Sequence, residues 1–492
     1  MAKRRATIEV PALGAIDPEA GQIGRQLARR LREAVMSGAL APGDRLPSTR
    51  SLAASLGISR GTVVEAFDQL RAEGVLDAKV GAGTRVASAL EDEPIASIGS
   101  ASASPKIREV RLPPSAVRLA AVSRTLVPQP DVPFAVAVPA AGIAPDDAWR
   151  RLGNRVRATA RAAPASYADP FGTLELRAAI AEHVRRSRGV RCEAEQVIVT
   201  SGTQQGLYMA GRVLVSRGDA VWAEDPAYPG LTAVLDDLEL RTHRVPVDDQ
   251  GIDVARGVAL APAARAAFVT PSHQYPVGMP LSMARRQALI GWAERNQAWI
   301  VEDDYDSELR YAGHPFPALQ GLSPSRVVYL GTFSKVLFPS LRLGYVIAPE
   351  FLVDAFGGAR AILDRHSPTA EQHVLAAYMR EGLFESHIRR IRGLYSERRE
   401  ALLDALSSRL PEGCAVQPSD QGMHILIWLP TGTDDVRIAE SAQAIGLTLR
   451  PISRMYCDPP GRPGLMLGFG GFPTERLRAA VDDLVPLLGT AR

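Results

Sequence analysis

The chain has 492 residues, with 46% hydrophobic residues, 23% charged residues and a formal net charge of +3; this length exceeds what one core normally supports, so we expect at least two domains. No apolar run approaches the ~20 residues that span a bilayer, and the basic start lacks the apolar segment of a secretory signal, so we expect a cytoplasmic protein without a membrane partner. The three cysteines, at positions 192, 414 and 457, are scattered, which argues against a disulfide framework and against a metal site.

The positive charge is concentrated near the N-terminus. Residues 22–88 contain ten Lys and Arg against six Asp and Glu, whereas the rest of the chain is close to neutral. This distribution favours a polyanionic partner for the N-terminal region alone.

The same region carries the pattern of three helices and a hairpin. Apolar residues recur every four positions over 23–35, which predicts an amphipathic helix. Ser48 and Ser59 are suited to cap two further helices, with a sharp turn at Gly57 between them. Residues 75–87 then predict a short, glycine-interrupted hairpin.

A helix, a glycine turn, a second helix and a wing form the arrangement that places a recognition helix in the major groove of DNA. A small three-helix protein-interaction module is the alternative. The segments PGDRLPSTR and LGISRGTV resemble the GntR family of winged-helix regulators. That resemblance implies binding to double-stranded operator DNA through the residues at the family's contact positions, which are Arg50, Ser59, Arg60, Thr62 and, in the wing, Gly81.

A change in composition separates this region from the rest of the chain. Residues 89–115 are rich in Ser, Ala and Pro and lack periodicity, so we expect a domain at 1–88, a linker at 89–115 and a second domain at 116–492. In the second domain, apolar strand-like runs alternate with helical patterns, which predicts an α/β domain with a largely parallel, buried sheet. Several strands end in polar residues, so we expect one site at the carboxyl edge of the sheet.

Lysine is almost absent from the second domain. Lys335 is the only lysine between residues 107 and 492, where arginine supplies every other Lys or Arg charge. Because arginine cannot form an imine, one retained lysine indicates a task that needs a primary amine. Thr332, Ser334 and Arg342 flank it in GTFSKVLFPSLRLG, and we expect them to bind a phosphate group beside that amine.

Other strand ends supply groups that suit a phosphorylated pyridine aldehyde. Residues 201–205 lie between a strand and a helix, and they offer backbone N–H groups to the phosphate. Asp303 and Tyr305 are two positions apart at a strand end, so their side chains share a face. We expect the carboxylate to pair with the protonated ring nitrogen, the phenol to bind the ring oxygen, and Tyr228 to stack on the ring.

This set of residues resembles the aminotransferase class I domain of pyridoxal-phosphate fold type I from about residue 116 onward. The resemblance implies a multidomain chain, with a small α+β winged helix-turn-helix before a large α/β domain that carries a smaller C-terminal α+β lobe, and pyridoxal 5'-phosphate as the cofactor. It also implies that Lys335 is the Schiff-base lysine. The other implied cofactor residues are Asp303, Tyr305 and Tyr228 at the ring, Thr203, Gln204, Thr332 and Arg342 at the phosphate, and Tyr167, which crosses a homodimer to the partner's phosphate.

Two positions depart from the aminotransferase pattern. The usual Asn-Pro-Thr-Gly segment appears as SHQYPVG, which leaves residues 273–275 as stand-ins for the asparagine. In GLMLGFGG, Met466 occupies the position of the arginine that binds the substrate carboxylate in aminotransferases. The candidate substitutes are Arg450, Arg454 and Arg462.

The order of a GntR-type domain, a linker and an aminotransferase-like domain resembles the MocR/GabR regulators over nearly the whole chain. This resemblance implies a homodimeric transcription regulator that senses pyridoxal phosphate itself, or an amine or amino-acid effector through an aldimine. The alternative is an active pyridoxal-phosphate-dependent aminotransferase that carries a regulatory DNA-binding domain. Met466 favours the sensor, so we expect any enzyme activity to be incidental.

Overall fold

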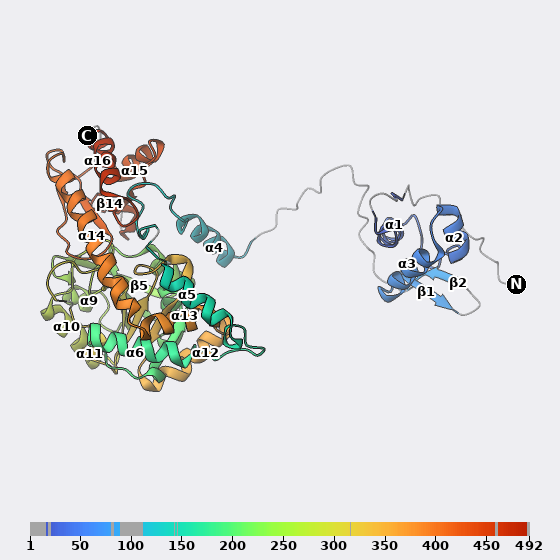
Figure 1. Ribbon diagram of the computed structural model, residues 1–492, viewed down its shortest axis with the longest axis horizontal. Helices are drawn as coiled ribbons and strands as arrows, with labels where there is room; N and C mark the ends of the chain where they lie inside the picture. Colours follow the sequence, from blue (N-terminus) through green and yellow to red (C-terminus); the bar gives the residue numbers. More distant parts are fainter. Residues whose placement is uncertain are drawn as a thin grey trace. The chain divides into compact units, whose positions relative to one another are not determined.

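The computed structural model describes residues 16–17, 21–79, 83–88, 112–141, 143–144, 146–314, 316–457 and 461–489. The chain divides into two units, residues 1–111 and 112–492 (Figure 1). Gly81 and most of the predicted linker lie outside the described residues. No helix in the described ranges is long and apolar enough to cross a membrane.

The N-terminal unit contains three helices and a two-stranded hairpin. Ser48 Oγ accepts the Ser51 N–H at the start of the second helix, Gly57 ends that helix with a φ of +66°, and Ser59 Oγ accepts the Thr62 N–H at the start of the third helix. The predicted caps and turn are therefore confirmed. The elements are α1 (Ile23–Met36), α2 (Thr49–Leu56), α3 (Arg60–Ala72), β1 (Leu76–Lys79) and β2 (Gly83–Val86).

The helices of this unit pack around one apolar cluster. Leu27 and Leu31 of α1 are fully buried against Val63 and Leu70 of α3, and the strand residue Leu76 closes the same cluster. The strands β1 and β2 pair in antiparallel register. Three helices followed by a hairpin are the winged helix-turn-helix that the sequence predicts.

The C-terminal unit is built on an eight-stranded sheet in the order β3-β10-β9-β8-β7-β4-β5-β6. The pairs from β9 through β8, β7 and β4 to β5 are parallel, whereas β10 is antiparallel to both its neighbours and β6 is antiparallel to β5. The predicted α/β domain is therefore confirmed, and the sheet is mixed, with five parallel strands at its centre. The strands are β3 (Val197–Thr200), β4 (Ala220–Asp225), β5 (Arg241–Asp248), β6 (Gly251–Ile252), β7 (Ala266–Val269), β8 (Trp299–Asp304), β9 (Val327–Thr332) and β10 (Gly344–Ile347).

Helices cover both faces of this sheet because successive strand residues point to opposite sides. On β8, for example, Val301 packs with Phe356 of α12, whereas Ile300 packs with Trp292 of α10 on the other face. The first face is covered by α7 (Thr203–Leu214), α8 (Pro229–Asp237) and α12 (Val353–Asp364). The second face is covered by α9 (Val254–Leu260), α10 (Met283–Arg295) and α11 (Leu319–Leu322), and near β3 by α6 (Leu174–Arg188) and α13 (Thr369–Arg380).

A smaller α+β lobe follows at the C-terminus (Figure 1). Its four strands form an antiparallel sheet in the order β11-β12-β14-β13, and α14, α15 and α16 contribute to the core beneath it. The strands are β11 (Ala415–Val416), β12 (His424–Trp428), β13 (Arg450–Pro451) and β14 (Gly464–Gly468), and the helices are α14 (Leu383–Ser407), α15 (Asp435–Ala444) and α16 (Thr474–Gly489). The remaining helices of the unit, α4 (Pro114–Thr125) and α5 (Asp147–Arg157), precede the large sheet in the chain.

Candidate functional site

A cavity of about 240 Å³ lies at the carboxyl ends of the large sheet's parallel strands, where the C-terminal lobe meets them. Five of the predicted cofactor residues line it together, although they come from four separate segments of the chain. The lining residues are Val136, Ala137, Thr203, Tyr228, Thr270, Tyr275, Asp303, Tyr305, Asp306, Lys335, Met423, His424 and Arg450.

Asp303 sits at the buried end of β8, and one of its carboxylate oxygens has no partner. The side chain is 8% exposed, and Oδ1 accepts no hydrogen bond within the described residues. Burial, reinforced by the neighbouring Asp304 carboxylate, raises the pKa of Asp303 to about 7. A buried acceptor without a donor is rare in native proteins, so this oxygen suits a bound group that brings its own N–H.

Lys335 shares the cavity with Asp303 and follows the end of β9. Burial lowers the pKa of the Lys335 amine, whereas the Asp306 and Asp303 carboxylates act in the opposite direction. A lowered pKa increases the fraction of the neutral amine, which is the form that attacks a carbonyl.

The start of α7 forms one end of the site. Thr203 is the first residue of α7, and Gly202 before it has a φ of +110°. A side-chain carbon at Gly202 would lie 3.5 Å from Arg342 Nη2, so the guanidinium lies directly beside this helix N-terminus. The helix N–H groups and an arginine together suit a phosphate.

The other predicted phosphate residues differ in where they point. Thr332 Oγ1 donates to Ser334 Oγ at 3.1 Å and accepts the Ser334 N–H at 3.2 Å, so both hydroxyls lie just before Lys335. Gln204 instead donates from Nε2 to Gly230 O in α8 at 2.9 Å, and it does not line the cavity.

Three tyrosines surround the cavity. Tyr275 packs edge-on against Tyr228 and against Tyr305, with ring centroids 5.6 and 5.9 Å apart. Burial raises the pKa of Tyr228 to about 12 and that of Tyr305 well above its usual range, so both phenols keep their protons at neutral pH.

The segment 273–275, which replaces the usual asparagine, provides one residue that lines the cavity. Tyr275 does so, and its hydroxyl accepts from Arg450 Nη1 at 3.1 Å. Gln274 is buried and donates to Glu224 Oε2 and to Pro226 O. His273 lies behind Tyr305, with Nδ1 3.0 Å from the tyrosine hydroxyl.

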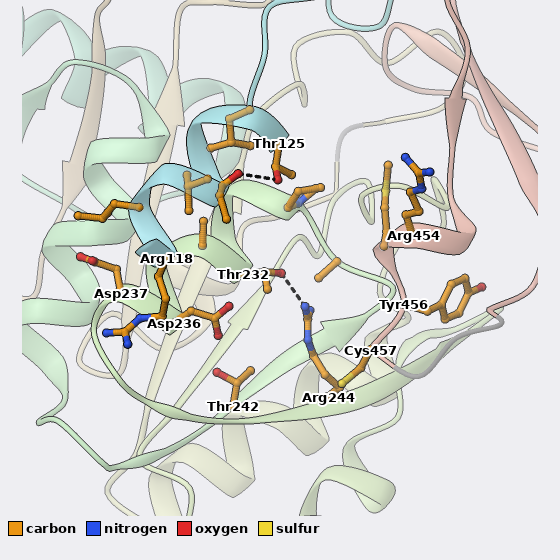
Figure 2. A pocket seen from close by; sticks show the side chains of 18 residues that line it. Arg118, Thr125, Thr232, Asp236, Asp237, Thr242, Arg244, Arg454, Tyr456 and Cys457 are labelled. Atoms are coloured by element: carbon orange, nitrogen blue, oxygen red, sulfur yellow. Dashed lines mark hydrogen bonds between the residues drawn. The ribbon is translucent and has the colours of Figure 1, made fainter. Parts of the chain in front are cut away.

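The three candidate substitutes for the missing arginine lie in three different places, and only one of them lines this cavity. Arg450 on β13 lines the cavity, whereas Arg462 lies over the Trp428 ring at 3.8 Å from its centroid. Arg454 lines a second cavity of about 560 Å³ between α4, α8 and residues 454–457 (Figure 2). That larger cavity contains none of the predicted cofactor residues.

Met466 is fully buried and cannot serve a charged ligand. It packs in an apolar cluster with Leu426 and Ile452, and in the sheet register it lies beside Arg450. The arginine that lines the cavity here is therefore Arg450 on β13. It lies one strand away from Met466 on β14, the position at which the aminotransferase pattern has its arginine.

Tyr167 does not reach this chain's cavity. Its side chain is 76% exposed, and its ring contacts only His366 and Arg365 among the described aromatic and cationic neighbours. Its predicted role in a partner's site therefore stays a prediction.

The predicted DNA-contacting residues lie at the N-terminal ends of two helices. Arg50 is the second residue of α2 and Arg60 the first of α3; both are exposed, and within the described N-terminal unit neither has a carboxylate within 4 Å. Ser59 and Thr62 bond each other through their side-chain oxygens at 2.8 Å. Helix N-termini with unpaired arginines suit contact with DNA phosphates and base edges.

Sequence reasoning missed Asp306 and His424, both of which line the cavity. Asp306 stands in the EDDYDSE segment but carries no local signal of its own. His424 lies on β12, more than a hundred residues away, and burial next to His273 lowers its pKa to about 4.

Comparison with known proteins agrees with this architecture. The family of aminotransferases class I and II matches residues 139–481, and the gntR family of bacterial regulatory proteins matches residues 23–86. In fold, the C-terminal unit is similar to LysN, the α-aminoadipate aminotransferase of Thermus thermophilus solved with N-(5'-phosphopyridoxyl)-L-leucine. The TM-score is 0.71 at 26% identity, over 77% of this chain and 97% of that one.

Two transcriptional regulators align with almost the whole chain, across both of its domains. The chain is 37% identical over 463 residues to the probable rhizopine catabolism regulatory protein MocR of Rhizobium meliloti, covering 94% of this chain and 92% of the relative. It is 36% identical over 477 residues to the pyridoxine biosynthesis transcriptional regulator PdxR of Corynebacterium glutamicum, covering 96% and 98%. The chain therefore belongs to the MocR-type transcriptional regulators, in which a GntR-type DNA-binding domain precedes a domain of the aminotransferase class I and II family.

Proposed function

We propose that this regulator binds pyridoxal 5'-phosphate at Lys335 and senses a small amine or amino acid there, so that ligand binding changes its affinity for operator DNA. One observation carries the proposal: the unpartnered carboxylate oxygen of Asp303 lies in the same cavity as the only lysine of residues 107–492. The orphaned acid fits the protonated ring nitrogen of the cofactor, so the residues present fit the group.

Each further residue has one role in holding the cofactor. Tyr228 would stack on the ring, Tyr305 would donate to its ring oxygen, and Asp303 would keep the ring nitrogen protonated. The N–H groups at the start of α7, with Thr203, Ser334 and Arg342, would bind the phosphate. When bound, the cofactor supplies an aldehyde carbon that reacts reversibly with primary amines.

Arg450 is the residue that we assign to the ligand's carboxylate. It lines the cavity from the C-terminal lobe and donates to Tyr275, which follows β7 in the large sheet. A ligand that displaces Lys335 with its amine and contacts Arg450 with its carboxylate would bridge the two parts of the unit. Such differential contact is what a ligand needs in order to shift a conformational equilibrium.

A working aminotransferase is the second candidate function. The cation at Arg450 favours it, because a clamp for the substrate carboxylate is then present, although from a different strand. The buried Met466 at the usual clamp position favours the sensor. Incubation with an amino-acid panel separates the two, because an aminotransferase releases keto acid at roughly 1 per second or faster, whereas a sensor gives a spectral change without sustained product.

We further propose that the protein acts as a homodimer. Tyr167 is exposed and lies away from its own cavity, as a residue that completes the partner's phosphate site would be. Sedimentation of the full chain tests the dimer, and a Tyr167→Phe variant should bind the cofactor more weakly without losing its own fold.

Covalent attachment at Lys335 is the direct test of the proposed function. Borohydride reduction of the protein loaded with pyridoxal phosphate should add the pyridoxyl mass to the peptide that contains Lys335. Lys335→Arg is the matched control, since it keeps the positive charge but cannot form the bond. Labelling elsewhere in the wild type, or unchanged labelling of Lys335→Arg, would exclude this assignment.

A further inference from the structure

A buried histidine and carboxylate lie behind Tyr305, and neither has been assigned a role in holding the cofactor. Nδ1 of His273 lies 2.8 Å from Asp306 Oδ2 and 3.0 Å from the Tyr305 hydroxyl. His273 and Asp306 are each 2% exposed. One ring nitrogen therefore faces both an acid and a phenol.

The chemistry of these groups decides where the protons lie. An ionised carboxylate can only accept, so Nδ1 satisfies Asp306 only if it carries a proton. A protonated Nδ1 has no lone pair left for the phenol, so the Tyr305 hydroxyl cannot donate to it. The hydroxyl proton of Tyr305 is then free to point into the cavity, which Tyr305 and Lys335 both line. The direction of this proton is the same whether the imidazole is neutral or charged.

The pair is held from the C-terminal lobe as well as from the large sheet. Ser419 Oγ lies 3.1 Å from His273 Nε2, and Gln421 Nε2 donates to Asp306 Oδ1 at 3.2 Å. A side-chain carbon at Gly422, which has a φ of +87°, would lie 2.3 Å from His273 Cε1. Only glycine permits this approach, so the imidazole is fixed on three sides.

We propose that His273 and Asp306 are positioning residues that direct the hydroxyl proton of Tyr305 toward the ring oxygen of the bound cofactor. The inference rests on the proposed function. A hydrogen-bond donor at the ring oxygen would stabilise the negative charge of that oxygen. The oxygen would then attract less strongly the proton on the Lys335 nitrogen that is linked to the cofactor, so this nitrogen would lose its proton at a lower pH. Loss of the donor should raise the pH at which the bound cofactor changes colour.

Several charged or titratable groups act on this region, so the test compares variants of equal charge. Those facing Lys335 and Tyr305 are Asp303, Asp306, Glu224, Tyr275, Arg342 and Arg450. His424 faces His273 with ring centroids 5.3 Å apart. His273→Phe removes the Nδ1 donor, whereas His273→Asn keeps an N–H near that position; both lack the imidazole, so their difference isolates the donor.

The experiment is an absorbance titration with pH of the full chain loaded with pyridoxal phosphate. We expect His273→Phe and Tyr305→Phe each to raise the midpoint by about one pH unit, the effect of one lost hydrogen bond, and His273→Asn to stay near wild type. Because His273 acts through Tyr305, the double variant His273→Phe/Tyr305→Phe should match Tyr305→Phe alone. Additive shifts, or an unmoved midpoint in His273→Phe, would overturn the proposal.

Two further variants guard against a folding defect. His273→Gln places its amide toward Ser419 rather than at the Nδ1 position, so it should shift the midpoint as His273→Phe does while remaining polar. Tyr378→Phe removes a different buried hydroxyl, which donates to Asp146 Oδ2 at 2.9 Å, and should leave the midpoint unchanged. A wild-type protein without a cofactor band refutes the proposed function, whereas a normal wild-type band with unmoved His273 variants refutes this inference alone.

Discussion

Neutralising Asp303 should raise the free energy of unfolding of the cofactor-free protein and lower the affinity of the protein for the cofactor. The folded-state pKa of Asp303 is about 7 against an ordinary value of 3.8. The folded state therefore retains a proton that the unfolded chain releases between about pH 4 and pH 7, so this group's contribution to stability falls as the pH rises through that window. At about 1.4 kcal/mol per pKa unit, the charged form costs about 4 kcal/mol above pH 7.

Asp303→Asn removes this penalty and nearly preserves the shape of the side chain. The free energy of unfolding of the cofactor-free variant should exceed that of the wild type by up to about 4 kcal/mol at pH 8, and by less at pH 5. Glu302 is also buried with a pKa of about 7, and it contributes the same slope to both proteins. Glu224, buried with a pKa of about 7, repels the Asp303 carboxylate. The difference between the two proteins therefore reports on Asp303 together with its repulsion from Glu224.

Urea unfolding followed by tryptophan fluorescence is the assay, because all five tryptophans lie in the C-terminal unit. Pyridoxal phosphate should then stabilise the wild type more than the variant, since only the wild type offers a carboxylate to the ring nitrogen. Asp304→Asn is the matched control. Asp304 is paired with Arg188 at 2.8 Å, so its neutralisation should destabilise by about 3–5 kcal/mol at both pH values. Equal stabilities of Asp303→Asn and wild type at pH 8 would refute the reasoning.

Four other predictions concern DNA and ligand. Arg60→Ala should weaken binding to operator DNA by about 1–3 kcal/mol, measured by fluorescence anisotropy, whereas Lys335→Arg should still bind; undiminished affinity in Arg60→Ala would exclude this docking. Ser59→Ala should lower the stability of the N-terminal unit by about 1 kcal/mol in a thermal melt because α3 loses its cap, and Ser59→Asn should restore it; equal melting of all three proteins would contradict the assigned cap. Arg450→Met should reduce the affinity for amino acids but not for amines without a carboxylate, as read from the cofactor band, and an equal loss for both ligand classes would remove Arg450 from the carboxylate site. Finally, operator DNA should change the ligand's affinity by the same factor as ligand changes the DNA affinity, with a coupling of about 1–3 kcal/mol; ligand-independent DNA binding would leave the aminotransferase as the better function.

Features that depend on a few neighbouring residues were predictable from the sequence. Ser48 and Ser59 cap their helices and Gly57 ends one with a positive φ, because a cap or a turn is decided within about four residues. The buried strands β3, β7, β8 and β9 were predictable for a similar reason, since a continuous apolar run between polar strand ends already specifies burial on both faces. Lys335 stood out through composition alone.

Groups that meet across long stretches of chain were decided only by the tertiary structure. Arg450 could not be distinguished from Arg454 and Arg462 by sequence, because only the pairing of β13 with β14 brings it beside the buried Met466 and into the cavity. The network of His273, Asp306 and Ser419 likewise joins segments up to 146 residues apart. No local pattern encodes such a meeting: side-chain direction within an element follows from its own periodicity, whereas which elements face each other follows from the strand order and from the packing of the lobe against the sheet.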